Sequence, residues 1–239
     1  MKNIPNLLTL TNLFCGCLAA IFLIEEQPKF VLFSLTACLL LDFLDGQAAR
    51  MLRIQNRIGK QLDSLADVIS FGFVPGLIFF KLISQSSVAQ DVLWLPILGF
   101  VFTLSAALRL AKFNVTESDT GHFLGLPTPA ATIFAAGLLW VSSLPTCASC
   151  TEAFLHAYSL IFSLLFLSAA MLSNIPMFDL KIRSLKWKGN EVRWCYLLVS
   201  SALFVWLREV GLILAIVIYI FLSLLLYSLN ISPKDEIPR

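Results

Sequence analysis

Charged side chains are scarce in this chain of 239 residues, of which only 13% are Asp, Glu, Lys or Arg. A soluble globular domain carries about 25% charged residues, so the shortage excludes an ordinary water-soluble fold. The hydrophobic content of 58% agrees with this exclusion. The net charge of +2 lacks the excess of positive charge with which proteins bind nucleic acid. We therefore predict an all-α integral membrane protein that does not bind nucleic acid.

Histidine and cysteine are too few to favour a zinc site. The chain has two histidines and six cysteines, and four of the cysteines fall inside apolar stretches, where a thiol packs as a small apolar group. The other two, Cys147 and Cys150, have only His156 nearby, which leaves the four ligands of structural zinc incomplete. A disulfide between these two cysteines is the alternative that their spacing leaves open.

Long apolar stretches dominate the chain, and most reach the about 17–25 residues that a helix needs to cross the hydrocarbon core. The last two stretches are separated only by Arg208, Glu209 and Gly211, so one long bent helix is the alternative to two helices. The pattern predicts a polytopic bundle of about eight transmembrane helices. The eight stretches are 7–24, 30–49, 63–84, 92–110, 127–145, 154–174, 193–207 and 211–229.

The distribution of Lys and Arg predicts the orientation of the bundle. With the N-terminus in the cytoplasm and eight alternating spans, fourteen of the seventeen basic residues fall on cytoplasmic segments. Basic residues concentrate in cytoplasmic loops, so we expect both termini inside. We treat residues 1–239 as one domain, with a six-helix catalytic core in 1–175 and a basic loop plus two further spans in 176–239.

Two pairs of aspartates interrupt the apolar pattern on either side of a short basic loop. Asp42 and Asp45 are three residues apart, and Asp63 and Asp67 are four apart, so each pair shares a helix face. Because the loop is short, the two helices should be antiparallel neighbours whose carboxylates face each other. Oxygen-rich sites suit hard cations such as Mg²⁺ or Mn²⁺, and acids near a bilayer indicate function. The alternative is that these acids pair with the nearby arginines at the interface.

Small and basic residues accompany the carboxylates. Gly46, Ala49 and Gly59 would let a phosphorylated group approach the backbone, and Arg50 would bring positive charge to its phosphates. Mg²⁺ is usually bound by a few carboxylates together with substrate phosphates. The sequence therefore predicts a phosphate-containing substrate at the membrane surface.

The order and spacing of these residues resemble the signature of the CDP-alcohol phosphatidyltransferases. That signature is Asp, two residues, Asp-Gly, two residues, Ala-Arg, eight residues, Gly, three residues, Asp, three residues, Asp. Every spacing is met between residues 42 and 67. The resemblance implies that Asp42, Asp45 and Asp63 hold Mg²⁺ or Mn²⁺ against the diphosphate of a CDP-linked lipid. It also implies that Asp67 is the general base and a further metal contact.

The resemblance also implies contacts to the CDP-lipid. Near the N-terminus, Asn6 and Thr9 match a nucleotide-contacting Asn-x-x-Thr element, although Pro5 beside them also makes an ordinary helix start. In the basic loop, Asn56 falls where some relatives have a hydroxyl residue that contacts the nucleotide. The expected CDP-lipid contacts are Asn6, Thr9, Gly46, Ala49, Arg50, Asn56 and Gly59.

Three further stretches, PNLLTLTNLFCG at the start, LRLAKFN at 108–114 and FLGLPTPAA at 123–131, resemble the serine-using branch of that family. This resemblance implies transfer of a phosphatidyl group from CDP-diacylglycerol to L-serine, which gives phosphatidylserine and CMP. It further implies a homodimer, which we expect in a bacterial or archaeal cytoplasmic membrane. The distribution of Lys and Arg predicts that its active site faces the cytoplasm.

The expected serine contacts are Arg109, Asn114 and Thr128, because an arginine can bind the serine carboxylate while amide and hydroxyl groups orient the rest. Lys112 stands where those relatives often have Arg, which keeps the charge but loses bidentate geometry. Arg109 and Lys112 could equally be topology anchors at the end of the fourth span.

Two other functions fit parts of the pattern. A sister enzyme would use glycerol 3-phosphate or inositol phosphate, whose dianions need several cations in the acceptor pocket. A transporter of metal ions or solutes would also carry acids within its spans. A transport path should, however, place acids through the whole depth of the bilayer, and here they cluster at one face.

Overall fold

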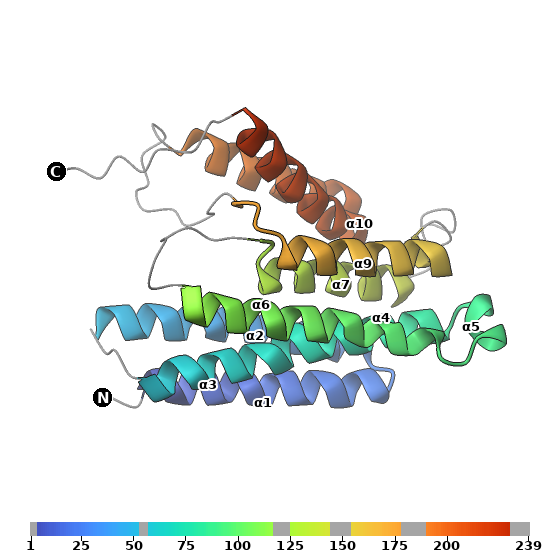
Figure 1. Ribbon diagram of the computed structural model, residues 1–239, viewed down its shortest axis with the longest axis horizontal. Helices are drawn as coiled ribbons and strands as arrows, with labels where there is room; N and C mark the ends of the chain where they lie inside the picture. The colour runs from blue at the N-terminus through green and yellow to red at the C-terminus, as the bar shows by residue number, and fades with distance from the viewer. Residues whose placement is uncertain (1–3, 53–56, 117–124, 144–153, 178–189, 230–239) are drawn as a thin grey trace.

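The computed structural model describes residues 4–52, 57–116, 125–143, 154–177 and 190–229, which form helices and no strands (Figure 1). The all-α prediction is therefore confirmed for these residues, while the predictions for Asn56, Cys147 and Cys150 fall outside them. The first half contains α1 (Ile4–Ile24), α2 (Pro28–Met51), α3 (Arg57–Asp67), the π-helix η1 (Val68–Phe73), α4 (Val74–Ser84) and α5 (Ser87–Asp91). The second half contains the 3₁₀-helix η2 (Leu95–Gly99), α6 (Phe100–Thr116), α7 (Thr128–Ser143), α9 (Ala157–Leu172) and α10 (Glu191–Ser228).

Within the described residues, five helices are long and apolar enough to cross a membrane, and α7 and α9 are shorter apolar helices. Large apolar side chains also cover the outer surface, where Phe33 is 75% and Trp206 is 89% exposed. Such exposure would be costly in water and is expected of helices that face lipid. The chain is an integral membrane protein, while the count of eight spans stays a prediction. The five candidate spans are Ile4–Ile24, Pro28–Met51, Ile58–Ser84, Leu95–Val115 and Val210–Ser228.

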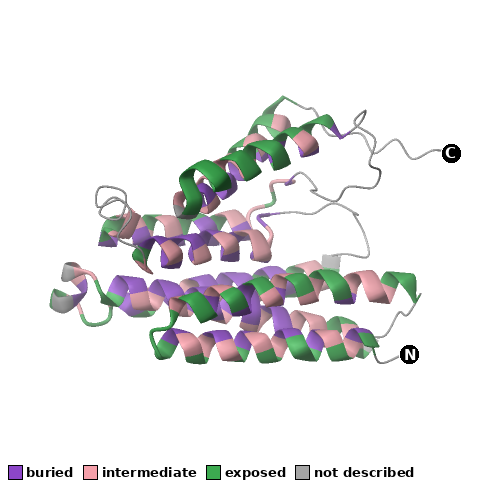
Figure 2. Ribbon diagram, turned by 180° about the vertical axis from the view of Figure 1, so that it is seen from behind, coloured by how far each residue is buried: buried purple, intermediate pink, exposed green. Residues whose placement is uncertain are grey.

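The continuous helix formed by α3, η1 and α4 lies at the centre of the bundle. In its most apolar window 67% of the residues are buried, against 28% for both α1 and α2 (Figure 2). Its side chains Ile78 and Phe79 pack with Phe102 of α6 and Leu138 of α7 in the apolar core. This central helix also carries Asp63 and Asp67, so the core fixes their position.

Close packing of α1 against the central helix depends on Gly16. A Cβ atom at this position would lie 2.6 Å from Ser70 Oγ and 3.2 Å from Ser70 Cα. No larger residue fits without moving one of the helices apart. The buried face of α1 around Gly16 therefore packs directly against η1.

The last helix, α10, is a hairpin of two antiparallel segments (Figure 1). Arg208 breaks the helix with φ 46° and ψ −111°. Across the hairpin, Tyr196 Oη donates a hydrogen bond to the carbonyl oxygen of Ala215 at 3.3 Å, and the rings of Tyr196 and Tyr219 meet edge to face. The prediction of two helices separated near Arg208 is confirmed, and the single bent helix is excluded.

Candidate metal centre

Three carboxylates from two helices converge at one end of the bundle. Asp42 lies on α2, while Asp63 and Asp67 lie one turn apart on α3. One carboxylate oxygen from each lies within 4.8 Å of the others. In the ranges that the structure describes, no other group of His, Cys, Asp or Glu gathers in this way. The spacing of the aspartates predicts that all four carboxylates face each other, and three of the four converge.

The donor set of this cluster fits a hard divalent cation. Asp67 is buried, and its Oδ1 atom has no hydrogen-bond partner among the described residues. Arg109 of α6 is close enough to Asp67 to attract it electrostatically. One arginine cannot offset three nearby carboxylates, whose mutual repulsion grows as the surroundings become less polar. Oxygen ligands at this spacing are what Mg²⁺ and Mn²⁺ prefer, so Asp42, Asp63 and Asp67 could hold such an ion.

Asp45 is positioned differently from the other three aspartates. It is 5% exposed, and its Oδ2 accepts a hydrogen bond from Thr9 Oγ1 of α1 at 2.8 Å. Thr9 Oγ1 also lies 3.0 Å from the carbonyl oxygen of Pro5, so its single proton serves one acceptor at a time. Asp45 thus joins α2 to α1 beside the cluster, and its role as a fourth metal ligand stays a prediction.

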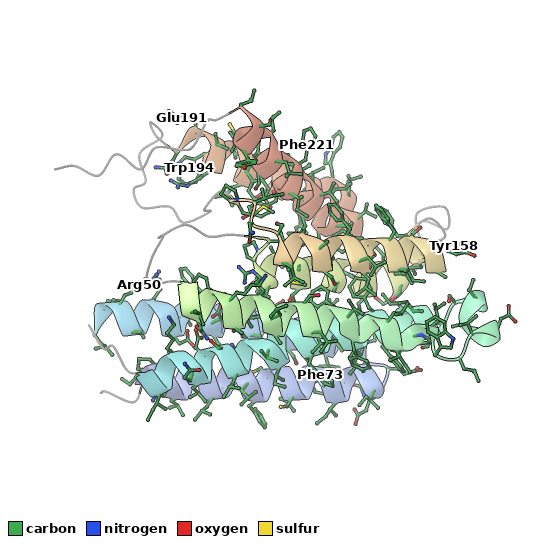
Figure 3. The ribbon with its side chains drawn as sticks, in the orientation of Figure 1. Arg50, Phe73, Tyr158, Glu191, Trp194 and Phe221 are labelled. Carbon is green, nitrogen blue, oxygen red and sulfur yellow. The ribbon has the colours of Figure 1, made fainter. Side chains whose placement is uncertain are left out.

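Those residues predicted to contact the CDP-lipid that the structure describes lie at the same end of the bundle. Asn6 lies half-buried on α1 and Gly59 half-buried on α3. A Cβ atom added at Gly46 would meet nothing within 4 Å, so open space lies beside α2 next to Asp45. Figure 3 shows Arg50 in the last turn of α2, far from Tyr158 at the opposite end of the molecule. Ala49 is half-buried one residue before it.

Two of the three residues predicted to bind serine are buried polar groups with atoms left unpaired. Arg109 is 8% exposed and Thr128 of α7 is 1% exposed, and neither Arg109 Nε nor Thr128 Oγ1 has a hydrogen-bond partner among the described residues. Buried polar atoms are rarely left this way without a ligand or water. Asn114 instead donates a hydrogen bond from Nδ2 to Ser64 Oγ at 2.6 Å, which ties α6 to α3.

The loop before α7 holds Thr128 in place. Gly125 has φ +74°, a conformation that favours glycine. Its amide donates to the carbonyl oxygen of Ile175 at 2.9 Å, and the Leu126 amide donates to the carbonyl oxygen of Ala170 at the same distance. These bonds fix the start of α7 against the last turn of α9 and the segment that follows it.

A π-helix follows Asp67 directly. Within η1, the carbonyl oxygen of Phe71 accepts from Thr132 Oγ1 at 3.2 Å, and that of Gly72 accepts from Thr103 Oγ1 at 3.1 Å. π-helical turns occur often at functional sites. Here the two threonines bond to carbonyl oxygens of the widened turn and tie it to α7 and α6.

Two residues near the cluster carried no role in the sequence analysis. Asn12 is fully buried on α1, three residues after Thr9. In the sequence it could have been found only as a further polar residue on the helix face that carries Thr9. Tyr219 of α10 is 2% exposed and is close enough to Arg109 for an electrostatic interaction. No pattern in the last stretch pointed to Tyr219, because only the folding of α10 over α7 brings it there.

The part of the chain that carries the aspartates is similar to known proteins. The sequence model of one family, CDP-alcohol phosphatidyltransferase, matches residues 2–172. The chain is 33% identical over 147 residues to the CDP-diacylglycerol–serine O-phosphatidyltransferase of Mycobacterium bovis, covering 58% of this chain and 49% of that protein. It is 34% identical over 135 residues to the enzyme of that name from Bacillus subtilis, covering 55% of this chain and 72% of that protein.

A relative from yeast gives a similar match. The CDP-diacylglycerol–serine O-phosphatidyltransferase of Saccharomyces cerevisiae is 34% identical over 158 residues, which cover 59% of this chain and 55% of that protein. The chain spans about half the length of the mycobacterial relatives that it matches. The helical hairpin α10 lies beyond the residues matched by the family model.

Proposed function

This chain belongs to the CDP-alcohol phosphatidyltransferase family, and from that premise we propose that it transfers the phosphatidyl group of CDP-diacylglycerol to L-serine. The products are phosphatidylserine and CMP. The observation that carries the proposal is the convergence of Asp42, Asp63 and Asp67 within 4.8 Å at the end of two apolar helices. The names of the relatives, all CDP-diacylglycerol–serine O-phosphatidyltransferases, support serine as the acceptor.

The proposed metal is Mg²⁺ or Mn²⁺, held by Asp42, Asp63 and Asp67, with Asp45 as a further candidate. When bound, such an ion supplies positive charge that offsets the diphosphate and the charge developing on the transferring phosphorus. The open space beside Gly46 leaves room for the CDP group next to the carboxylates. The apolar helix surfaces let the acyl chains of the lipid stay in the bilayer.

Asp67 is the proposed general base. Its buried Oδ1 atom has no partner among the described residues and can accept the proton of the serine hydroxyl. The serine oxygen then forms a bond to the lipid-side phosphorus, the bond from that phosphorus to the bridging oxygen breaks, and CMP leaves with the electron pair. Arg109 holds the serine carboxylate, and Thr128 Oγ1 offers a hydrogen bond beside it. The general base, the carboxylate contact and the nucleotide space thus come from different helices.

The charge distribution supports an orientation with both termini and the aspartate cluster on the cytoplasmic side. In this proposal the water-soluble serine reaches the cluster from the cytoplasm, and the lipid reaches it from the bilayer. A homodimer in a bacterial or archaeal cytoplasmic membrane remains part of the proposal through the family resemblance.

The transport alternative finds no support in the described residues. The acidic side chains that are buried there, Asp45 and Asp67, both belong to the same end of the bundle. A path for ions would need such groups through the whole depth of the membrane. The cluster is placed as expected for a reaction at the membrane surface.

Replacing Gly46 with leucine should lower the affinity for the lipid substrate without lowering the stability of the protein. The affinity for CDP-diacylglycerol should fall, with KM rising about 10-fold or more, because the side chain would occupy the space left for the CDP group. Stability should not fall, because a Cβ meets nothing there and leucine favours helices over glycine. The measurement is KM for the lipid together with Tm of the purified variant. An unchanged KM would place the CDP group elsewhere.

Replacing Arg109 with lysine should raise KM for serine about 10- to 100-fold, because the charge stays but the bidentate contact to the serine carboxylate is lost. KM for CDP-diacylglycerol should change little. The matched control is Lys112→Gln, an exposed position one turn along α6. If both variants keep the wild-type KM for serine, Arg109 is a topology anchor and not a serine contact.

The experiment that tests the function uses purified full-length protein with CDP-diacylglycerol and Mn²⁺ or Mg²⁺. Each of serine, glycerol 3-phosphate and inositol phosphate is added separately, and CMP release is measured. Release with serine alone is the expected result. Release with a phosphorylated alcohol alone would keep the metal centre and replace the acceptor, and no release with any alcohol would refute the proposed reaction.

A further inference from the structure

Asn12 is a fully buried polar side chain near the metal centre that the proposed reaction does not use. It is 0% exposed, and neither its Oδ1 nor its Nδ2 atom has a hydrogen-bond partner among the described residues. A primary amide offers one acceptor and two donor hydrogens, and burying all of them unpaired is costly. Such a group is expected to meet a polar partner when the site is complete.

The backbone contacts of Asn12 are to residues that lie about one helical turn from two of the carboxylates. Its carbonyl oxygen accepts hydrogen bonds from Ser70 Oγ at 3.3 Å and from Cys38 Sγ at 3.5 Å. Asp67 precedes Ser70 by three residues, and Asp42 follows Cys38 by four. Each aspartate therefore lies about one helical turn from a residue that bonds to the Asn12 backbone.

The direction of α1 turns the Asn12 side chain toward those aspartates. In an α-helix every Cα–Cβ bond tilts toward the N-terminus of the helix. The N-terminal side of Asn12 on α1 is the aspartate end, because Thr9, one turn earlier on the same buried face, bonds to Asp45 at 2.8 Å. The Cα–Cβ bond of Asn12 therefore tilts toward the end of the bundle that carries the carboxylates.

We propose that Asn12 is a positioning residue of the metal centre, whose amide bonds to the outer coordination shell of the ion held by Asp42, Asp63 and Asp67. The inference rests on the proposed function, since it assumes that these three carboxylates bind a divalent ion. Residues that hold the groups around a metal typically change its affinity about 10- to 100-fold when they are lost. Asn12 supplies that support from α1, a helix that contributes none of the three converging carboxylates.

The test replaces Asn12 with leucine, which has the same branched shape and no polar atoms. The probe is Mn²⁺ alone, titrated into the purified full-length protein without substrates, with free Mn²⁺ followed by electron paramagnetic resonance. Mn²⁺ affinity is expected to fall about 10- to 100-fold. Tm measured in chelator should stay the same or rise, because the unpaired amide has been removed. An asparagine with a merely structural role would give the reverse pattern, a lower Tm with unchanged Mn²⁺ affinity.

Two further variants keep the test decisive. Thr11→Val, on the exposed face of the same helix, should bind Mn²⁺ like the wild-type protein. Asn12→Ala cannot overpack the site, and it decides the question if the leucine variant fails to fold. Wild-type Mn²⁺ affinity in a folded Asn12 variant overturns the inference, as does a higher KM for serine without a change in Mn²⁺ affinity. If the wild-type protein itself binds no Mn²⁺, the proposed metal centre is refuted together with this inference.

Discussion

The Asp67→Asn variant is expected to lose about 10²- to 10⁴-fold in kcat, the usual contribution of a general base. An amide cannot take the proton of the serine hydroxyl, although it keeps the shape of the carboxylate. Affinity for CDP-diacylglycerol, measured at saturating Mn²⁺, should remain close to that of the wild-type protein, because Asp42 and Asp63 can then still hold an ion. The measurements are single-turnover CMP release and direct binding of the lipid.

The control for this prediction is Asp91→Asn on α5, an exposed position outside the carboxylate cluster. It should leave both lipid binding and turnover unchanged. An equal loss of binding and turnover in Asp67→Asn would show that Asp67 serves only as a metal ligand. A variant with normal turnover would remove Asp67 from the reaction.

Loss of the metal should abolish the activity. A chelator should stop CMP release, and added Mn²⁺ or Mg²⁺ should restore it. Losing a residue that only contacts the ligands of a metal typically costs about 10- to 100-fold in metal affinity. In the Asp42→Asn variant the half-saturating Mn²⁺ concentration should rise by more than this. The reason is that Asp42 provides one of the three converging carboxylate oxygens.

The matched control is Glu26→Gln, which removes an acid near the start of α2 and its ion pair with Lys81 at 3.2 Å. Its Mn²⁺ dependence should equal that of the wild-type protein. Full activity in excess chelator would contradict the account, and so would an unchanged Mn²⁺ dependence in Asp42→Asn.

The carboxylate cluster could be predicted because each of its determinants is local in the sequence. Helical spacing placed Asp63 and Asp67 on one face, and the short basic connection required α2 and α3 to be neighbours. The helix positions were predictable for the same reason, since apolar length decides them. The predicted stretches 7–24 and 30–49 correspond to Ile4–Ile24 and Pro28–Met51.

The partners of individual side chains could not be predicted, because they depend on how distant helices meet. Asp45 and Asp42 share a helix face, yet Asp45 bonds to Thr9 and is not one of the three converging acids. Asn114 bonds to Ser64 of α3, a contact that no local pattern indicated, while its role as a serine contact stays a prediction.

The π-helix η1 had no signal in the sequence either. Its hydrogen bonds to Thr103 and Thr132 come from residues more than thirty positions away in the chain. The polarity of Asn12 was visible in the sequence, but the lack of hydrogen-bond partners for its side chain among the described residues was not. Local patterns therefore indicated the chemistry of this site, while tertiary packing determined which polar groups remain available to it.

The most direct measurement of the central claim is an anomalous-difference map from crystals of the protein soaked in Mn²⁺. The account predicts a peak in contact with the carboxylates of Asp42, Asp63 and Asp67, and its loss in crystals of Asp42→Asn. A Mn²⁺ peak elsewhere, or no peak in protein that releases CMP under the same conditions, would contradict the assignment of this cluster as the metal centre of the transfer reaction.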